Sequence, residues 1–496
     1  MPTAIENLEG RLASILGAGR VQSQPHNLSE YAIDEVIPRA VVKPGNAAEA
    51  AEIVRFAAAE GLAVIAVGTR SKLGMGMPPA RYDIAMDMTA MREIAHYDPG
   101  DLTLSVDAGC TLGTIDAALR PQRQFLPLTM GYGHGATIAG TVASGVDSHL
   151  RQSYGTARDF LVGAEFIDGL GAQCKSGGRV VKNVTGYDLH KLLIGSLGTL
   201  AIITRLNFRT FPSLNAAEAQ GIFVASFSDA KGAIDFRQRI AASPFTPQAV
   251  EIWSPEVSKI LSDVDSRSWE PPSEPLSAWI APGDWHVVVL FAGTREIRDR
   301  YSVALGQLAD AAGALRSPTV EVGEAGDVAR TVGVLVVDTM RRVHGASQAA
   351  TIFKIAQVPA KLPELFAGLA KAAEQAQIPH ALFARGLGIT YFALLPEVPP
   401  NYLATAQVAA GLGPAEMEQL VAGAYGETIG RLEGVCKSIF SLCAGQSATV
   451  ALQFAPRALK RRINLAFGEA ADAAAMRKLK LAFDPHNIFA PGRMFS

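Results

Sequence analysis

The chain has 496 residues, more than a single hydrophobic core ordinarily supports, so we expect two or three domains. Hydrophobic residues make up 49% and charged residues 19%, and the formal net charge of −2 argues against nucleic acid as a partner. No C-x-x-C pair occurs among the four cysteines, which argues against a metal or iron–sulfur site in this chain (Cys110, Cys174, Cys436, Cys443).

The N-terminus shows no basic stretch followed by an apolar one, and no apolar run reaches the roughly 20 residues that span a bilayer. We therefore expect a cytoplasmic protein without a membrane span of its own. Membrane association through a partner stays compatible with this pattern.

Residues 1–32 predict a short N-terminal helical segment, because apolar residues recur there at helical spacing (Ile5, Leu8, Leu12, Leu16). An alternation of strands and helices then runs from Ala40 to Pro212. Strands are predicted over 40–44, 62–67, 83–87, 102–106 and 200–209, and helices over 46–61 and 114–119. Asn46 is the expected N-cap of the first of these helices.

The pattern changes after Pro212. A strand from Gly221, a helix over about 229–242 and a strand over 285–291 suit an antiparallel sheet with helices packed on one side. Residues 269–275 form a proline-rich loop or insertion, and residues 479–493 read as a helix, a turn and a short extended end.

The first glycine loop, Val67-Gly-Thr-Arg-Ser-Lys-Leu-Gly-Met-Gly76, follows a predicted strand. Such a turn aims consecutive backbone N–H groups at one point, which suits a pyrophosphate, and its side chains add donors and charge. A tight connection between two elements would explain the same residues.

The second loop, residues 130–145, formally matches the dinucleotide pattern Gly-x-Gly-x-x-Gly/Ala at Gly131, Gly133 and Ala136. Because the preceding residues contain a proline and make no clean strand, we reject a Rossmann interpretation. A run of small residues remains, which can lie against a planar ligand or a neighbouring helix.

The third segment holds Gly178-Arg-Val-Val-Lys-Asn-Val-Thr-Gly-Tyr-Asp-Leu189 and Gly195-Ser-Leu-Gly-Thr-Leu-Ala-Ile-Ile-Thr204. Its glycines allow close approach of backbone to a flat, phosphate-bearing ligand. Three such loops within about 180 residues favour ligand binding over packing alone.

This third segment resembles the flavin-binding domain of the vanillyl-alcohol-oxidase type, also called the PCMH type. Within that superfamily it is most similar to the FAD-binding subunit of bacterial glycolate oxidase, whose signature Lys-Asn-x-x-Gly-Tyr-Asp is followed by Gly-Ser-Leu-Gly-Thr-Leu. The resemblance covers residues 33–212 strongly and 213–496 weakly. The tail Phe483-Asp-Pro-His-Asn-Ile-Phe-Ala-Pro-Gly-Arg493 also resembles the end of that family, with Ala490 in place of an asparagine.

The resemblance implies an α+β fold: a two-subdomain PCMH-type FAD-binding domain, an antiparallel-sheet α+β cap domain and a C-terminal helical tail. The expected boundaries are 1–32, 33–212, 213–430 with an insertion around 254–345, and 431–496, and this last segment is expected to pack back on the FAD-binding domain. Carried over position by position, the implied FAD-binding residues are Gly68, Thr69, Arg70, Ser71, Lys72, Gly74, His134, Gly135, Ala136, Thr137, Gly140, Ser144, Gly145, Asp159, Lys182, Asn183, Gly186, Tyr187, Asp188, Gly198, Thr199 and Ile203.

Two departures from the family matter. Many relatives attach FAD covalently through a histidine of the first loop, but this loop reads Arg70-Ser-Lys72, so we expect non-covalent FAD. Relatives that oxidise 2-hydroxy acids carry a His-x-His-like pair in the C-terminal half, which is absent here. The histidines of that half are isolated in the sequence (His286, His344, His380, His486).

A hydroxy-acid oxidase needs a cation for the substrate carboxylate and a base near the flavin. The candidates in the cap segment are Lys354, Arg385 and Tyr391.

The leading hypothesis is an FAD-dependent oxidoreductase of the glycolate-oxidase type that acts on a small 2-hydroxy acid. The resemblance implies a second flavin subunit and an iron–sulfur subunit as partners. A non-catalytic electron-transfer or scaffold subunit and a free-standing FAD oxidase of another alcohol remain as alternatives.

Overall fold

A computed structural model of the chain describes residues 7–128, 131–179, 186–213, 220–262, 280–317, 319–321, 326–386, 388–397, 414–463 and 473–494. The chain forms two compact units. Unit 1 comprises Met1–Ser148, Tyr154–Ser213 and Asn464–Ser496, and unit 2 comprises His149–Ser153 and Leu214–Ile463. Within the described ranges, no helix combines the length and apolarity that crossing a membrane requires.

Unit 1 begins with α1 (Leu8–Leu16), β1 (Val21–Gln22) and α2 (Pro25–Ser29), followed by β2 (Ala40–Val42), α3 (Ala47–Glu60), β3 (Val64–Val67) and β4 (Ile84–Asp87). The four strands form one sheet in the order β1-β2-β4-β3, parallel except for the β1–β2 pair. The predicted cap of α3 is confirmed, because Asn46 Oδ1 accepts from the Glu49 N–H at 3.0 Å. Gly61 ends the helix in the left-handed conformation.

The second sheet of unit 1 has the order β5-β6-β10-β8-β9 and is antiparallel throughout. Its strands are β5 (Ile94–Asp98), β6 (Thr103–Asp107), β8 (Leu161–Ile167), β9 (Gln173–Gly177) and β10 (Ile202–Arg209). Beyond β4 the predicted strands at 102–106 and 200–209 and the predicted helix at 114–119 are found as β6, β10 and α4 (Leu112–Leu119). The regular strand–helix alternation does not continue, because β5 and β6, and likewise β8 and β9, follow one another as antiparallel neighbours. Adjacent antiparallel strands need no crossover helix, and β5 is joined to β6 by a short turn.

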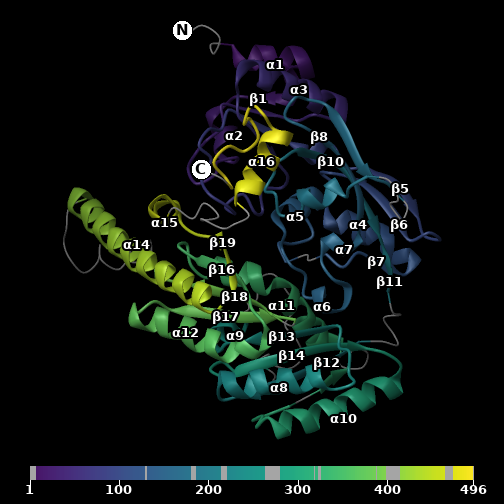
Figure 1. Cartoon of the computed structure of the whole chain (residues 1–496), viewed down its shortest axis with the longest axis vertical. Coiled ribbons are helices and arrows are strands. Elements are labelled where there is room, and N and C mark those ends of the chain that lie inside the picture. The colour runs from purple at the N-terminus through teal and green to yellow at the C-terminus, as the bar shows by residue number, and fades with distance from the viewer. Residues whose placement is uncertain are drawn as a thin grey trace. The chain divides into compact units, whose positions relative to one another are not determined.

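Shorter elements complete unit 1 (Figure 1). They are α4 (Leu112–Leu119), β7 (Gln124–Phe125), α5 (Ile138–Ser144), α7 (Ala157–Phe160), β11 (Phe211–Pro212) and α16 (Ala473–Phe483), with α6 (Arg151–Tyr154) at the boundary between the units. One continuous apolar core joins α1, α3, both sheets, α4 and α5.

Unit 2 is built on an eight-stranded antiparallel sheet of order β15-β12-β14-β13-β17-β18-β16-β19. The strands are β12 (Gln220–Phe227), β13 (Ala249–Trp253), β14 (Trp285–Ala292), β15 (Thr319–Glu321), β16 (Thr351–Ala356), β17 (His380–Arg385), β18 (Ile389–Leu394) and β19 (Thr449–Phe454). The helices are α8 (Ala230–Ala242), α9 (Pro255–Ser262), α10 (Arg295–Ala311), α11 (Gly326–Gly345), α12 (Leu362–Gln375), α14 (Pro414–Gly445) and α15 (Arg457–Arg462).

Helices cover both faces of this sheet, so the expectation of helices on one side is wrong. On one face Phe366 of α12 stacks on Trp285, and Phe440 of α14 packs on Phe353. On the other face Ser258 of α9 hydrogen-bonds His286, and a carbonyl of α11 accepts from Arg385. Burial from two sides explains why β18 is buried at every position instead of alternating.

Candidate functional site

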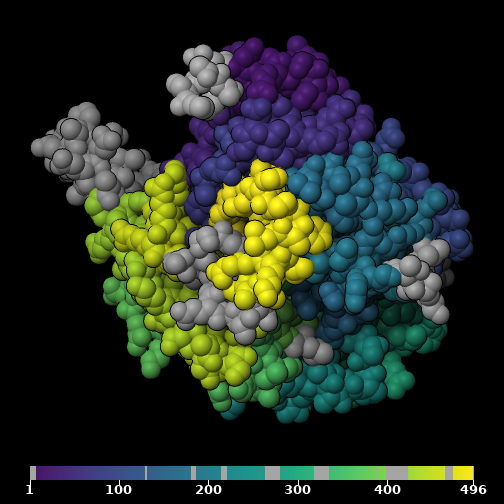
Figure 2. Space-filling view, turned by 45° about the horizontal axis from the view of Figure 1, so that its top comes forward, coloured from purple at the N-terminus to yellow at the C-terminus, as the bar shows by residue number. Residues whose placement is uncertain are grey.

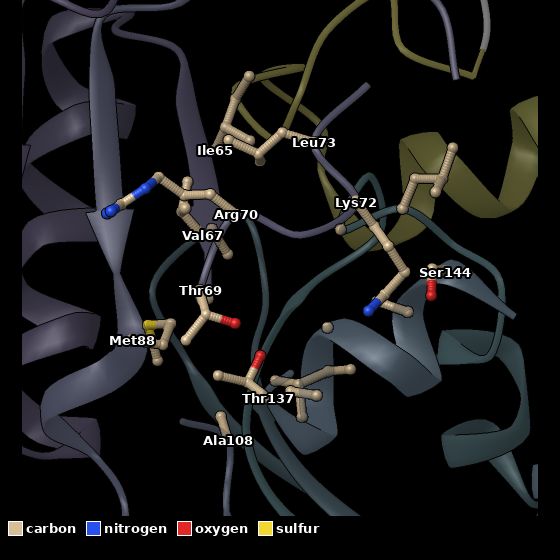
Figure 3. Close-up of a pocket in the computed structure, with 18 of the residues that line it drawn as sticks. Ile65, Val67, Thr69, Arg70, Lys72, Leu73, Met88, Ala108, Thr137 and Ser144 are labelled. Carbon is tan, nitrogen blue, oxygen red and sulfur yellow. The ribbon is translucent and has the colours of Figure 1, made fainter. Parts of the chain in front are cut away.

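One cavity of unit 1 draws its walls from all three glycine-containing segments (Figure 3). The first loop contributes Gly68–Leu73 directly after β3, and the second contributes Thr137 and one face of α5. The third segment contributes Leu197, Gly198, Ala201 and Ile203. The predicted FAD residues that line this cavity are Gly68, Thr69, Arg70, Ser71, Lys72, Thr137, Gly140, Ser144, Gly198 and Ile203.

Polar groups converge on this cavity from two elements. In Figure 3 the hydroxyls of Thr69 and Thr137 and the amine of Lys72 point into the same space. A hydrogen bond orients the Thr69 side chain, because its hydroxyl donates to the Gly135 carbonyl at 2.8 Å. Lys72 Nζ donates to Ser71 Oγ at 3.1 Å. The cavity therefore offers the Thr137 hydroxyl and one ammonium group as donors, while the Thr69 hydroxyl oxygen can still accept a hydrogen bond.

The backbone of the first loop supplies further donors. Within the described part of the chain, the N–H groups of Thr69, Arg70, Ser71 and Lys72 donate to no protein acceptor. Successive free N–H groups in one turn form an anion-binding concavity. The loop is thus suited to a phosphate or pyrophosphate.

Small residues let the second loop approach the first very closely. A Cβ built on Gly68 would lie 2.1 Å from Thr137 Oγ1, and one built on Gly140 would lie 2.8 Å from the same oxygen. Ala139, Gly140, Ala143 and Ser144 present a wall of short side chains on α5. Such a wall accepts a flat ring system.

The Lys72 ammonium group points into the cavity, unlike the Arg70 guanidinium. Burial lowers the pKa of its ammonium group to about 8, because desolvation disfavours the charged form. The amine also lies 4.9 Å from the centre of the Tyr132 ring. An anion bound beside it would stabilise the charged form and raise this pKa.

Arg70 is oriented differently from its neighbours. Its guanidinium points away from the cavity in Figure 3, forms an ion pair with Glu30 at 3.2 Å and lies over the Tyr31 ring at 4.7 Å. Its φ of +66° places it in the left-handed region. Arg70 therefore fixes the shape of the loop, and its backbone faces the ligand space.

Several residues implied by the resemblance do not line the cavity. Asp159 forms a capping box with Thr156 at the start of α7, and Asp188 pairs with Lys191 at 2.9 Å. Thr199 is buried and donates to the Ser196 carbonyl at 2.7 Å. The others in this group are Gly74, His134, Gly135, Ala136, Gly145, Gly186 and the exposed Tyr187. Lys182 and Asn183 lie outside the described residues.

Three further cavity residues were not predicted from the sequence (Met88, Ala108, Arg493). Met88 and Ala108 complete the apolar wall, and both follow strands of different sheets. Arg493 also lines the cavity and donates through Nη2 to the Leu73 carbonyl at 2.8 Å and to the Met75 carbonyl. The resemblance of the tail was the signal that could have identified Arg493.

The three candidate catalytic residues lie in unit 2. Lys354 on β16 is directly opposite Tyr391 on β18, so both lie on one face of the sheet. Arg385 is 1% exposed and forms an ion pair with the fully buried Glu251 at 2.7 Å. Tyr391 is likewise buried and stacks on Phe383, with the ring centres 4.8 Å apart.

Three histidines on or beside the sheet of unit 2 have packing partners (His286, His344, His380). His286 Nε2 accepts from the Ala281 N–H at 3.2 Å while its Nδ1 lies 2.8 Å from Ser258 Oγ. His344 stacks on Phe454 and His380 lies beside Phe392. In the part of the chain that the structure describes, no three His, Cys, Asp or Glu side chains gather as a metal site would require.

Comparison with known proteins identifies the class. The family model of the FAD binding domain matches residues 38–177, and that of the C-terminal domain of FAD linked oxidases matches residues 459–494. Two stretches of the chain thus match domains of FAD-linked oxidases, and the predicted cofactor FAD is confirmed. The free N–H groups, the inward ammonium and the small-residue wall of the cavity fit this cofactor.

The predicted resemblance to the FAD-binding subunit of bacterial glycolate oxidase is confirmed as well. The chain is 36% identical over 167 residues to glycolate oxidase subunit GlcE of Escherichia coli, an alignment that covers 34% of this chain and 47% of that protein. It is 28% identical over 284 residues to D-lactate dehydrogenase of Archaeoglobus fulgidus, which covers 55% of this chain and 60% of the relative. The chain thus matches about half the length of these curated relatives.

Solved structures confirm the predicted fold class. 4-Ethylphenol oxidase from Gulosibacter chungangensis has a TM-score of 0.73 at 15% identity, covering 98% of this chain and 96% of that chain. p-Cresol methylhydroxylase has a TM-score of 0.73 at 16% identity, covering 98% and 95%. At these identities the likeness is one of fold alone.

Proposed function

We propose that the chain is an FAD-dependent oxidoreductase of the glycolate-oxidase type, which oxidises a small 2-hydroxy acid such as glycolate or D-lactate and passes the electrons to a partner or acceptor. The observation that carries the proposal is the convergence of three glycine-containing segments on one cavity, and the first two of these segments lie within the stretch that matches the FAD binding domain. The relatives include proteins named as glycolate oxidase subunits, D-lactate dehydrogenase and D-2-hydroxyglutarate dehydrogenase.

In this proposal the first loop binds the pyrophosphate of FAD through the N–H groups of Thr69–Lys72 and through the Lys72 ammonium. Thr137 and the small residues of α5, with Gly198 and Ile203, contact the flat parts of the cofactor. Bound FAD supplies the hydride-accepting chemistry, and the protein binds and orients it. Lys354, Arg385 and Tyr391 remain the proposed substrate-side residues.

The flavin is held without a covalent bond. The proposal rests on the cavity walls, since none of the described residues that line it is a histidine, cysteine or tyrosine. Two of the relatives are named as subunits of glycolate oxidase, which supports a complex of several subunits. The second flavin subunit and the iron–sulfur subunit that the sequence resemblance implies are the proposed partners.

A second candidate is a flavin-binding electron-transfer subunit without its own substrate site. The buried Arg385–Glu251 ion pair favours it, because a cation already neutralised by a carboxylate is a poor ligand for a substrate carboxylate.

Visible spectra of the purified chain under anaerobic conditions test these proposals. Acid precipitation that leaves the yellow flavin in the supernatant supports non-covalent FAD. Bleaching of the flavin band by glycolate or D-lactate supports catalysis by this chain. A flavin that stays oxidised until partner subunits are added favours electron transfer, and turnover of another alcohol with oxygen alone favours a free-standing oxidase. A colourless protein that does not take up FAD would overturn all of them.

A further inference from the structure

The C-terminal segment, residues 473–494, returns to unit 1 and lies against the first loop. Figure 2 shows this segment in yellow against the purple and blue surface of unit 1. The Val64 N–H donates to the Ile488 carbonyl at 2.8 Å, and the Ala490 N–H donates to the Val64 carbonyl at 3.0 Å. β3 is the last strand in its sheet, so the segment covers an otherwise unpaired edge.

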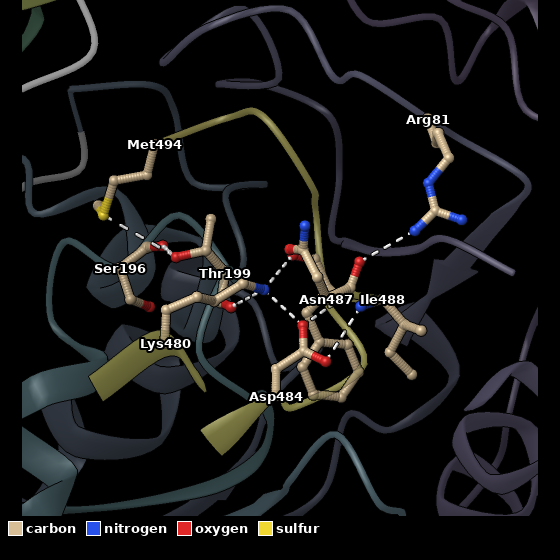
Figure 4. A network of polar contacts seen from close by, with 9 residues as sticks. Arg81, Ser196, Thr199, Lys480, Asp484, Asn487, Ile488 and Met494 are labelled. Atoms are coloured by element: carbon tan, nitrogen blue, oxygen red, sulfur yellow. Dashed lines mark hydrogen bonds and ion pairs between the residues drawn. The ribbon is translucent and has the colours of Figure 1, made fainter. Parts of the chain in front are cut away.

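Lys480 ties this segment to the third cavity wall (Figure 4). Its buried ammonium donates to the Thr199 carbonyl at 2.8 Å, to the Phe489 carbonyl at 2.8 Å and to the Asp484 carboxylate. Asp484 is fully buried and also accepts from the N–H groups of Ile488 and Phe489 at 3.0 and 2.7 Å. All three ammonium protons are thereby used, and one of them holds the turn that carries Gly198.

Arg493 ties the same segment to the first loop. It is 4% exposed, and its Nη2 donates to the carbonyls of Leu73 and Met75. The Arg493 carbonyl in turn accepts from the Met77 N–H at 2.9 Å. These bonds hold the part of the loop that follows the proposed phosphate-binding turn.

The three segments meet at Gly76, whose φ is +80°. A Cβ built there would lie 2.7 Å from Leu197 Cδ1 and 2.9 Å from the Arg493 carbonyl oxygen. The first loop, the third wall and the C-terminal segment are therefore packed together without room for a side chain. A shift of the C-terminal segment would displace both walls.

From these contacts we propose that Lys480 and Arg493 are positioning residues for FAD: the docked C-terminal segment holds the first loop and the 195–199 turn at the separation that the cofactor needs. The proposal rests on the proposed FAD site in this cavity. Because coupling between two binding events is reciprocal, bound FAD in turn holds the C-terminal segment in place.

The experiment compares Arg493→Met, Arg493→Lys and Lys480→Met with two controls on the exposed side of α16, Arg477→Met and Lys478→Met. FAD dissociation constants come from flavin fluorescence on the full chain. We expect at least tenfold weaker FAD binding in Arg493→Met and Lys480→Met, partial recovery in Arg493→Lys, and wild-type affinity in the controls. Wild-type affinity in both Met variants would overturn the proposal.

A second readout separates this proposal from the assignment of the cavity to FAD. Amide hydrogen exchange of the apo chain should be at least tenfold faster at residues 75–77 and 197–199 in the two Met variants than in the controls. If the wild-type chain binds no FAD but exchange rises as expected, the cavity assignment fails while the role in positioning the walls stands. Unchanged exchange at both sites refutes that role, whatever the flavin does.

Limited proteolysis supplies the reciprocal test. FAD should slow cleavage of the wild-type chain after residue 473 and should protect the two Met variants less. Equal protection of wild type and variants would contradict the coupling.

Discussion

Gly68 and Thr137 lie so close together that no side chain fits at position 68, because a Cβ there would lie 2.1 Å from Thr137 Oγ1. The two residues belong to different loops, one after β3 and one before α5, and both line the cavity. Their contact sets the distance between the anion-binding turn and the small-residue wall.

Replacing Gly68 by alanine should therefore push these loops apart. Overpacking of this kind costs about 1–3 kcal/mol, so we expect FAD to bind roughly 5- to 150-fold more weakly. Flavin fluorescence titration gives the affinity, and Thr137→Ala in the same chain should restore part of it. Gly434→Ala, in open space on α14, serves as the control and should leave the affinity unchanged.

FAD affinity should depend on pH through Lys72. Burial lowers the pKa of this residue to about 8 in the apo chain, and an anionic ligand favours its charged form. Binding therefore takes up a proton above about pH 8, and the dissociation constant should rise as the pH increases from 8 to 10. Lys72→Met should bind weakly without this rise, and Lys72→Arg should bind well across the range. A wild-type affinity that does not change between pH 7 and 10 would contradict the role of Lys72.

Through Lys72, the stability of the apo chain should rise with pH over the same range in which the affinity for FAD falls. The folded-state pKa of Lys72 lies below its unfolded value, so the unfolded chain binds more protons between about pH 8 and 10.5. The contribution of Lys72 to the free energy of unfolding therefore rises with pH across this window. Denaturant titrations of wild type and Lys72→Met, each without flavin, measure the difference.

Breaking the buried pair of Glu251 and Arg385 should destabilise unit 2. Burial raises the pKa of the Glu251 carboxyl, although Arg385 lowers it, and Glu251→Gln would leave the guanidinium without its counter-charge. We expect a loss of about 3–5 kcal/mol in unfolding free energy. The exposed pair of Asp235 and Arg239 is the matched control, and Asp235→Asn should cost less than about 1 kcal/mol.

The double variant Glu251→Met with Arg385→Met tests the catalytic role of Arg385. Replacing both charges by apolar side chains should recover most of the stability that the single change loses. If the folded double variant is still bleached by glycolate or D-lactate like the wild type, Arg385 does not bind the substrate carboxylate.

Acid should weaken unit 2 through His286. Burial lowers the pKa of this fully buried imidazole to about 4. Since the folded-state pKa lies below the unfolded value, the contribution is complete above about pH 6.5 and is lost as the pH falls towards 4, by at most about 3 kcal/mol. Denaturant titrations between pH 7 and 4 should show a smaller loss in His286→Gln than in wild type. The exposed His486→Gln should behave as wild type.

The sequence predicted those parts of the fold that are determined by residues close together in the chain. The Asn46 cap, the Gly61 end of α3 and the buried strands β2, β3 and β4 follow from residues a few positions apart. The three glycine segments likewise marked the loops that meet at the cavity.

The rest depends on distant contacts that leave no local pattern. The antiparallel partners of β10 are β6 and β8, and its register is set by side chains far away in sequence. Arg493 donates to Leu73 across 420 positions. Arg70 shows a further limit, because its basic side chain suggested a phosphate ligand whereas the fold pairs it with Glu30.

The position of the C-terminal segment in the chain has a consequence for biosynthesis. Residues 64–77 leave the ribosome early, but the residues that pair with them at 488–493 follow only after the whole of unit 2. The edge of β3 thus stays unpaired throughout the synthesis of unit 2. On the proposed cofactor site, we expect a nascent chain to capture FAD stably only after residues 488–493 have been synthesised.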